Sequence, residues 1–66
     1  MENKTEKPKA KVIGENGNVF NLIGICSKAL KNAGQPDKAK EMSGRVMASG
    51  SYTEALQIME EYCELI

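Results

Sequence analysis

Two cysteines are the side chains of this sequence most suited to nucleophilic chemistry, and neither has the partner that such chemistry needs. Cys26 and Cys63 lie far apart in a chain that has no histidine, so no imidazole is present to activate a thiol. Two thiols without CxxC spacing are also too few for a structural zinc site. We therefore expect two reduced, buried cysteines that behave as small hydrophobes. A Cys26–Cys63 disulfide is the alternative.

Carboxylates form a second candidate group near the end of the chain. Glu60, Glu61 and Glu64 lie within one helical turn of each other, and carboxylates at such spacing can bind a hard cation or form an acid–base pair. No calcium-binding loop of the DxDxDG type accompanies them, and charged residues on a helix usually form a solvated face. We expect a solvated acidic face, and therefore no catalytic residue, no metal site, no cofactor and no enzymatic activity.

A glycine- and asparagine-rich turn is the third candidate, at residues 14–18. Backbone N–H groups at the start of a helix can hold phosphate or carboxylate, and the side chains of Asn16, Asn18 and Asn21 could add donors around Gly17. The turn matches neither GxGxxG nor the P-loop pattern. The first interpretation is a structural turn in which Asn18 caps the following helix. The alternative is a small anion- or nucleotide-sequestering protein that uses Asn16, Gly17, Asn18 and Asn21.

The apolar spacing predicts which elements position these residues. Residues 10–14 are partly β-branched and end at glycine, which predicts a short strand. Helical periodicity then predicts a helix over about residues 18–33, capped by Gly34. Its apolar stripe comprises Val19, Leu22, Ile23, Cys26, Ala29, Leu30 and Ala33. Phe20 and Ile25 lie on the two flanks of this stripe, so we expect the first half of the helix to be covered on more than one side.

Two further helices are predicted downstream. Pro36 suits the first turn of a helix that ends before Gly50, and Ser51 with Glu54 forms a capping box for the next helix. The stripe of that last helix comprises Tyr52, Ala55, Leu56, Met59, Tyr62, Cys63 and Ile66. Ile58 is expected outside it.

The glutamates at the end of the chain are disfavoured by the negative pole of a helix dipole. Either the last helix ends near Tyr62 and residues 63–66 lie extended beside the strand, or the basic N-terminal segment packs against the glutamates. Both arrangements bring the chain ends together. The expected fold is a mostly helical α+β domain over residues 10–66, with the order β-α-α-α and its C-terminus near the strand, preceded by a disordered polar leader over residues 1–9.

The length of the chain bears on its partners. Sixty-six residues are near the lower limit for a chain that buries enough surface to fold alone, so we expect a homodimer with Phe20, Gly24, Ile25 and Ile58 at the contact. Nine basic and nine acidic residues give zero net charge, which argues against a nucleic-acid partner. No signal peptide and no long apolar run are present, so we expect a cytoplasmic protein without a membrane segment.

Two resemblances follow from the motifs. Gly50, Tyr52, Ala55 and Leu56, within residues 49–65, resemble the second helix of a tetratricopeptide repeat, which implies an antiparallel helix pair. More broadly, the pattern GxNGNVFNLIG at residues 14–24, with later matches as far as Tyr52, resembles a group of small uncharacterised bacterial proteins often found in prophages and other mobile elements. That resemblance implies no activity. It implies an accessory role, such as binding a host or phage protein or countering a defence system.

Overall fold

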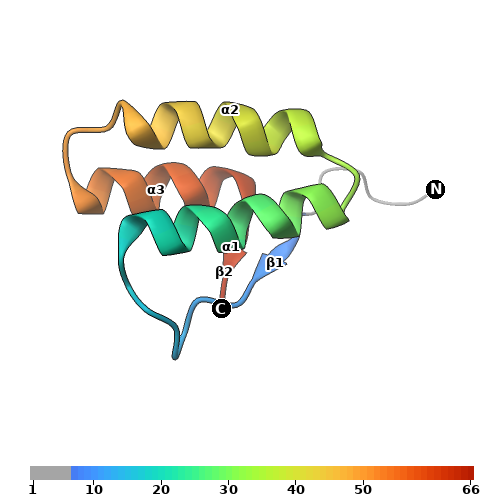
Figure 1. Ribbon diagram of the computed structural model, residues 1–66, viewed down its shortest axis with the longest axis horizontal. Helices are drawn as coiled ribbons and strands as arrows, with labels where there is room; N and C mark the ends of the chain where they lie inside the picture. The colour runs from blue at the N-terminus through green and yellow to red at the C-terminus, as the bar shows by residue number, and fades with distance from the viewer. Residues whose placement is uncertain (1–6) are drawn as a thin grey trace.

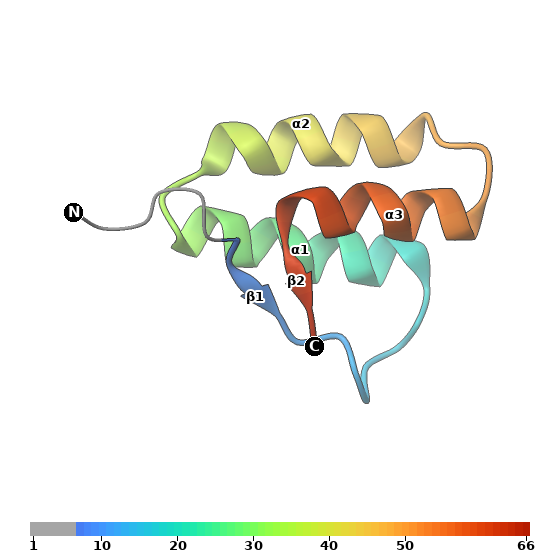
Figure 2. The ribbon, with the colours of Figure 1, turned by 180° about the vertical axis from the view of Figure 1, so that it is seen from behind.

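The computed structural model describes residues 7–66 and has the mostly helical fold expected from the sequence. Its elements, in chain order, are β1 (Lys9–Ala10), α1 (Val19–Asn32), α2 (Pro36–Met47), α3 (Tyr52–Tyr62) and β2 (Glu64–Leu65). The three helices lie side by side, and the two strands lie on the side of α1 and α3 that faces away from α2 (Figures 1 and 2). Consecutive helices run in opposite directions, so α2 and α3 form an antiparallel pair.

The helix ends follow from capping residues that the sequence analysis identified. The Asn18 side chain accepts a hydrogen bond from the backbone N–H of Phe20 at 2.8 Å, which starts α1. Gly34, with φ of +79°, ends that helix in the left-handed conformation that glycine adopts without strain. The Ser51 hydroxyl accepts from the Glu54 N–H at 3.1 Å and starts α3. The Glu54 carboxylate returns to the N–H of Gly50 at 3.0 Å and completes the cap.

The N-terminal strand is shorter than predicted and begins earlier. It covers Lys9–Ala10 instead of residues 10–14, because the chain turns directly afterwards: the Glu15 N–H donates to the Val12 carbonyl at 3.1 Å, and Gly14 has a φ of +86°. A left-handed residue ends an extended segment. Of the predicted leader over residues 1–9, Lys9 belongs to β1, and Lys7 and Pro8 form hydrogen bonds to the end of the chain. Residues 1–6 lie outside the described residues.

The two chain ends pair, as the sequence predicted. α3 ends at Tyr62, and the extended backbone of Cys63 leads into β2. β2 runs parallel to β1, with Lys9 opposite Glu64 and Ala10 opposite Leu65. The first of the two arrangements expected for the glutamates is therefore confirmed. The basic segment also reaches the end of α3, where Lys7 Nζ donates to the backbone carbonyl of Glu60 at 2.7 Å.

One hydrophobic core joins all five elements. Its buried residues are Ala10, Leu22, Cys26, Leu30, Ala39, Met42, Val46, Ala55, Ile58, Met59 and Cys63. The expectation that Ile58 lies outside the core is wrong: its side chain is 8% exposed. The buried residues of α3 are Ala55, Ile58 and Met59, with Tyr62 partly buried against the core, and this set also has helical spacing. This face is rotated around the helix by about one residue relative to the apolar stripe predicted from Tyr52, Ala55 and Leu56.

Candidate functional site

The turn before α1 uses its own polar groups. The Asn16 side-chain oxygen accepts from the Asn18 N–H at 2.9 Å, and Asn18 caps the N–H of Phe20. The Asn21 side-chain amide donates to the Asn16 carbonyl at 2.8 Å. Two backbone N–H groups that an anion would need at this helix start are therefore already paired with asparagine oxygens. The structural interpretation of Asn16, Gly17, Asn18 and Asn21 accounts for this geometry, and anion binding there stays a prediction.

The acidic residues near the chain end take part in a surface network. Arg45 donates to both carboxylate oxygens of Glu61, at 2.7 and 3.3 Å, and to the Tyr62 hydroxyl at 3.1 Å. That hydroxyl donates to Glu41 at 2.7 Å. The hydrogen bonds from Arg45 lower the pKa of Glu61, whereas burial, followed by the bond to Glu41, raises the pKa of Tyr62. The network ties α2 to α3, and the ionised Glu61 in it is a poor proton acceptor.

Both cysteines are buried and free. Cys26 Sγ lies 3.7 Å from the sulfur of Met59, and Cys63 Sγ lies 3.6 Å from the Cys26 carbonyl oxygen. Burial raises the pKa of the Cys26 thiol to about 12, and burial also raises the pKa of Cys63. A thiol must ionise to act as a nucleophile or metal ligand. The expectation of two reduced, buried cysteines is confirmed, and the alternative Cys26–Cys63 disulfide is not formed.

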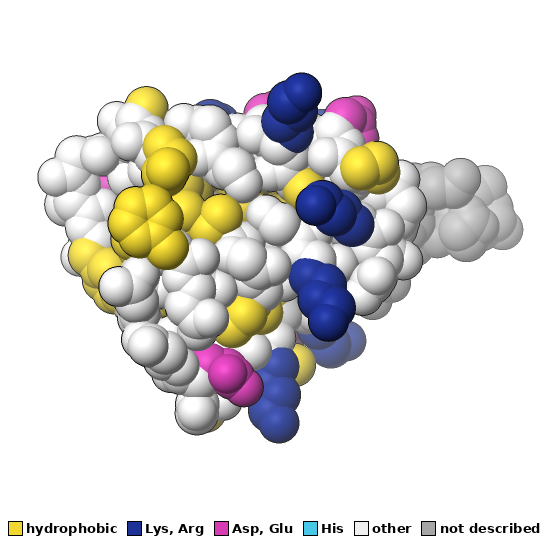
Figure 3. Space-filling view, in the orientation of Figure 1, with side chains coloured by type: hydrophobic (Ala, Val, Ile, Leu, Met, Phe, Trp, Pro, Cys, Tyr) yellow, Lys and Arg dark blue, Asp and Glu magenta, His cyan; other side chains and the backbone are white. Residues whose placement is uncertain are grey.

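The most prominent exposed feature is an apolar patch at the end of the molecule where α1 begins and α2 ends. We define the apolar patch as Phe20, Ile23, Met47 and Tyr52. Phe20 is 63% exposed, Met47 64% and Tyr52 49%. Hydrophobic side chains gather there on the face shown in Figure 3. Large apolar residues that are exposed next to each other are typical of binding surfaces.

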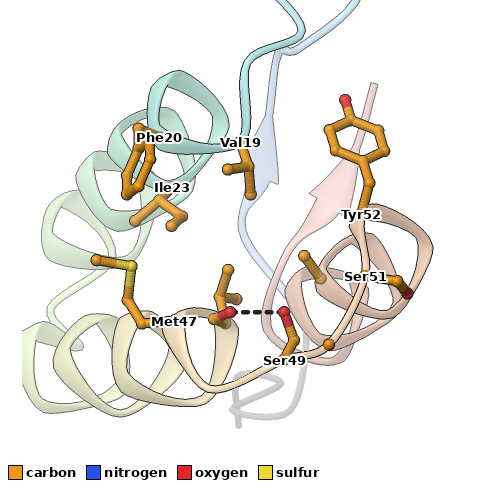
Figure 4. A pocket seen from close by; sticks show the side chains of 10 residues that line it. Val19, Phe20, Ile23, Met47, Ser49, Ser51 and Tyr52 are labelled. Atoms are coloured by element: carbon orange, nitrogen blue, oxygen red, sulfur yellow. Dashed lines mark hydrogen bonds between the residues drawn. The ribbon is translucent and has the colours of Figure 1, made fainter.

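The apolar patch surrounds a hollow of about 310 Å³. Phe20, Ile23 and Met47 point toward one another from α1 and the end of α2, and Tyr52 stands on the opposite side (Figure 4). Val19, Ser49 and Ala55 also line the hollow. In Figure 4, Val19 lies between Ile23 and Tyr52, and Ser49 lies below them. The Tyr52 hydroxyl donates to the Gly17 carbonyl at 2.6 Å, so the ring is held in place at the edge of the hollow.

The structure separates the four residues expected at a homodimer contact. Phe20 is in the apolar patch. Gly24 is exposed on α1, and a Cβ built there would meet nothing within 4 Å. Ile25 is half-buried and packs against the core, and Ile58 is inside it. Of the four, Phe20 alone presents a large exposed side chain.

Sequence reasoning missed Met47 and misassigned Tyr52. Met47 follows Val46, the last buried residue of α2, and its type alone does not distinguish an exposed methionine from a core one. Tyr52 was counted in the apolar stripe of α3. Tyr52 is the first residue after the Ser51 cap, and its spacing from Ala55 and Leu56 does not show whether a neighbouring element reaches far enough to cover it.

None of the helices within residues 7–66 has the length and apolarity needed to cross a membrane. Within the same residues, no three His, Cys, Asp or Glu side chains lie close enough together to hold a metal ion. The chain matches no protein-family model, and comparison with curated proteins and with solved structures finds no significant similarity to either.

Proposed function

We propose that this protein is a non-enzymatic interaction protein that binds a helix of a partner protein at the apolar patch. The observation that carries the proposal is the exposure of Phe20 and Met47, each more than 60%, at the edge of one hollow. Exposing two large apolar side chains costs hydration free energy, which a partner that covers them recovers.

A helix suits this surface better than a small molecule does. The hollow is open and lies where α1 begins, α2 ends and α3 begins. An open apolar groove between helices can receive the apolar face of a partner helix. Methionine adapts its shape to different partners. Polar groups that converge on a small ligand are few, because Ser49 Oγ already donates to the Val46 carbonyl at 2.6 Å.

The non-enzymatic part of the proposal rests on the side chains available for chemistry. The chain has no histidine, and its thiols are buried with raised pKa values. The biological setting proposed is the one that the sequence resemblance implies: a phage or mobile-element accessory protein, acting in the cytoplasm, whose partner is a host or phage protein.

Affinity capture with three matched baits tests the proposal. The baits are the wild-type chain, Phe20→Asp and Ile13→Asp. Ile13 is 73% exposed and lies outside the hollow, so Ile13→Asp makes the same chemical change at a different place. We expect a partner protein that the wild type and Ile13→Asp retain and Phe20→Asp loses. The partner, once purified, should shift the amide resonances of Phe20, Ile23 and Met47 in a titration.

Two results would overturn the proposal. One is a partner that Phe20→Asp retains as well as the wild type does, provided that circular dichroism shows all three baits folded. The other is a set of shifted resonances confined to β1, β2 and the turn between residues 12 and 15.

A further inference from the structure

We infer that the partner helix is acidic at one end, because the groove that begins at the apolar patch continues along α1 and α2 to a pair of lysines. This inference rests on the proposed function, since it names the chemistry of the helix that would bind there.

The groove comprises two hollows that α1 and α2 both line. In its middle, Ser27 of α1 and Ser43 of α2 lie with their hydroxyl oxygens 3.3 Å apart. Beyond these serines lies a second hollow of about 320 Å³, lined by Ser27, Lys31, Pro36, Ala39, Lys40 and Ser43. Residues of each helix that line the two hollows recur every three or four positions, as on one helix face. The same faces of α1 and α2 therefore contribute to both hollows, with the Ser27–Ser43 pair between them.

The chemistry of the groove changes along its length. The first hollow has the exposed apolar residues Phe20 and Met47, and the second has the exposed amines of Lys31 and Lys40. No acidic side chain lines either hollow in the part of the chain that the structure describes. In Figure 3 the largest group of hydrophobic side chains lies over one half of this face and most of the Lys or Arg side chains over the other, with a few hydrophobic and acidic side chains near the basic ones.

The length of the groove and the position of its lysines define the helix that would fit it. Phe20 and Lys31 are eleven residues apart on one helix, so at 1.5 Å per residue the groove is about 16 Å long. A helix of about three turns covers it. That helix would place leucine-like residues on Phe20 and Met47, and Glu or Asp about two turns further on, opposite the lysines. Opposite charges at the edge of an interface add selectivity and speed association.

A second copy of this chain fits the groove poorly. If the grooves of two molecules packed against each other in parallel, Lys31 and Lys40 of one molecule would lie against the same lysines of the other. The exposed face of α3 has acidic residues, but beyond Tyr52 it exposes no large apolar side chain. Among residues 7–66, the outer face of α3 therefore offers Tyr52 as its one large exposed apolar side chain ahead of its acidic residues, whereas the apolar patch has Phe20 and Met47 to be covered.

Two synthetic helical peptides test this inference on the wild-type chain. Each has about 15 residues and carries leucines on one face at one end. Two turns away on the same face, one peptide has three glutamates and the other has three lysines. We expect the glutamate peptide to bind roughly three- to tenfold more tightly at low salt, and the difference to shrink as salt is added. Binding is measured by amide-resonance titration.

Charge reversal locates the effect. Lys31→Glu/Lys40→Glu should reverse the preference between the two peptides. The control Lys11→Glu/Lys38→Glu makes the same change in net charge at exposed lysines outside both hollows, and it should keep the wild-type preference.

The outcomes distinguish this inference from the proposed function. If both peptides bind equally and Phe20→Asp abolishes both, the acidic partner is overturned and the apolar patch still binds a helix. The inference also fails if the preference for the glutamate peptide survives Lys31→Glu/Lys40→Glu, or if neither peptide shifts any resonance of the groove. The proposed function is tested separately, by the capture experiment.

Discussion

The hydroxyl of Tyr52 donates a hydrogen bond of 2.6 Å to the carbonyl of Gly17, across 35 residues of sequence. The bond joins the turn before α1 to the first residue of α3. It therefore holds Tyr52, on one side of the apolar patch, against the loop that leads to Phe20 on the other side. The shape of the patch thus depends on a contact between two distant segments.

Removing this hydroxyl should loosen the turn without unfolding the protein. We expect Tyr52→Phe to lower the free energy of unfolding by about 0.5–1 kcal/mol and to speed hydrogen exchange of the amides in residues 14–18. Tyr62→Phe is the matched control, because its hydroxyl bonds to Arg45 and Glu41 instead. Wild-type exchange rates in the turn of Tyr52→Phe would show that the bond does not restrain it.

Two glycines should respond to alanine in opposite directions. Gly24 lies inside α1 with open space around a built Cβ, whereas Gly34 has a φ of +79°. Gly24→Ala should raise the free energy of unfolding by about 0.5–1 kcal/mol, and Gly34→Ala should lower it by about 1–2 kcal/mol. Urea unfolding measures both. A loss of stability in Gly24→Ala would show that a neighbour not present in the single chain packs on this position.

The buried thiols should make the protein sensitive to alkali. The pKa of Cys26 rises from 9.0 to about 12 on folding, so above about pH 9 the unfolded chain releases a proton that the folded chain keeps. The stabilisation is complete below the unfolded pKa and is lost as the pH rises toward 12, at up to about 1.4 kcal/mol per pH unit. Urea unfolding at about pH 8 and about pH 10 measures the loss.

Cys26→Ala provides the comparison for this effect. The substitution lowers stability at every pH because it leaves a small cavity, but its stability should fall less between the two pH values. Tyr62, whose pKa is also raised, titrates in both proteins and cancels. Cys63 interacts with Cys26, so the difference between the two proteins includes any change in the titration of Cys63. Equal slopes for the two proteins would mean that Cys26 ionises in the folded state as readily as in the unfolded one.

Oligomeric state decides between a partner protein and a second copy at the apolar patch. The homodimer was expected because Phe20, Ile25 and Ile58 would otherwise be exposed to solvent. In the single chain, Ile58 is buried in the core and Ile25 is half-buried. We therefore expect light scattering to give a 7.2 kDa monomer at high micromolar concentration. A dimer that Phe20→Asp dissociates would place a second copy on the groove and overturn the inferred acidic partner.

The sequence predicted the helices well, because their ends depend on local chemistry. Asn18, Gly34, Pro36 and Ser51 each satisfy or terminate the backbone hydrogen bonds of a helix within a few residues, and such signals can be read from neighbours in the chain. The pairing of the chain ends was predicted from the unfavourable position of the last glutamates on a helix dipole.

What the sequence did not predict depends on contacts between distant segments. Ile58 has the same local pattern whether it is buried or exposed, and its burial follows from how α3 rotates to meet the other helices. The apolar patch depends on the end of α2 lying beside the start of α1, which puts Met47 near Phe20. Helical periodicity contains no information on which of two flanks a neighbouring helix covers.

The parallel pairing of β1 and β2 also sets how the molecule resists force. The Glu64 N–H donates to the Pro8 carbonyl, the Ile66 N–H to the Ala10 carbonyl, and the Val12 and Ile13 N–H groups to the Ile66 carbonyl. Tension applied between residue 7 and residue 66 pulls two parallel strands in opposite directions along their length. The hydrogen bonds between the strands are then loaded in shear and must break together. The sheet, with two residues in each strand, therefore resists the separation of the chain ends and acts as a mechanical clamp.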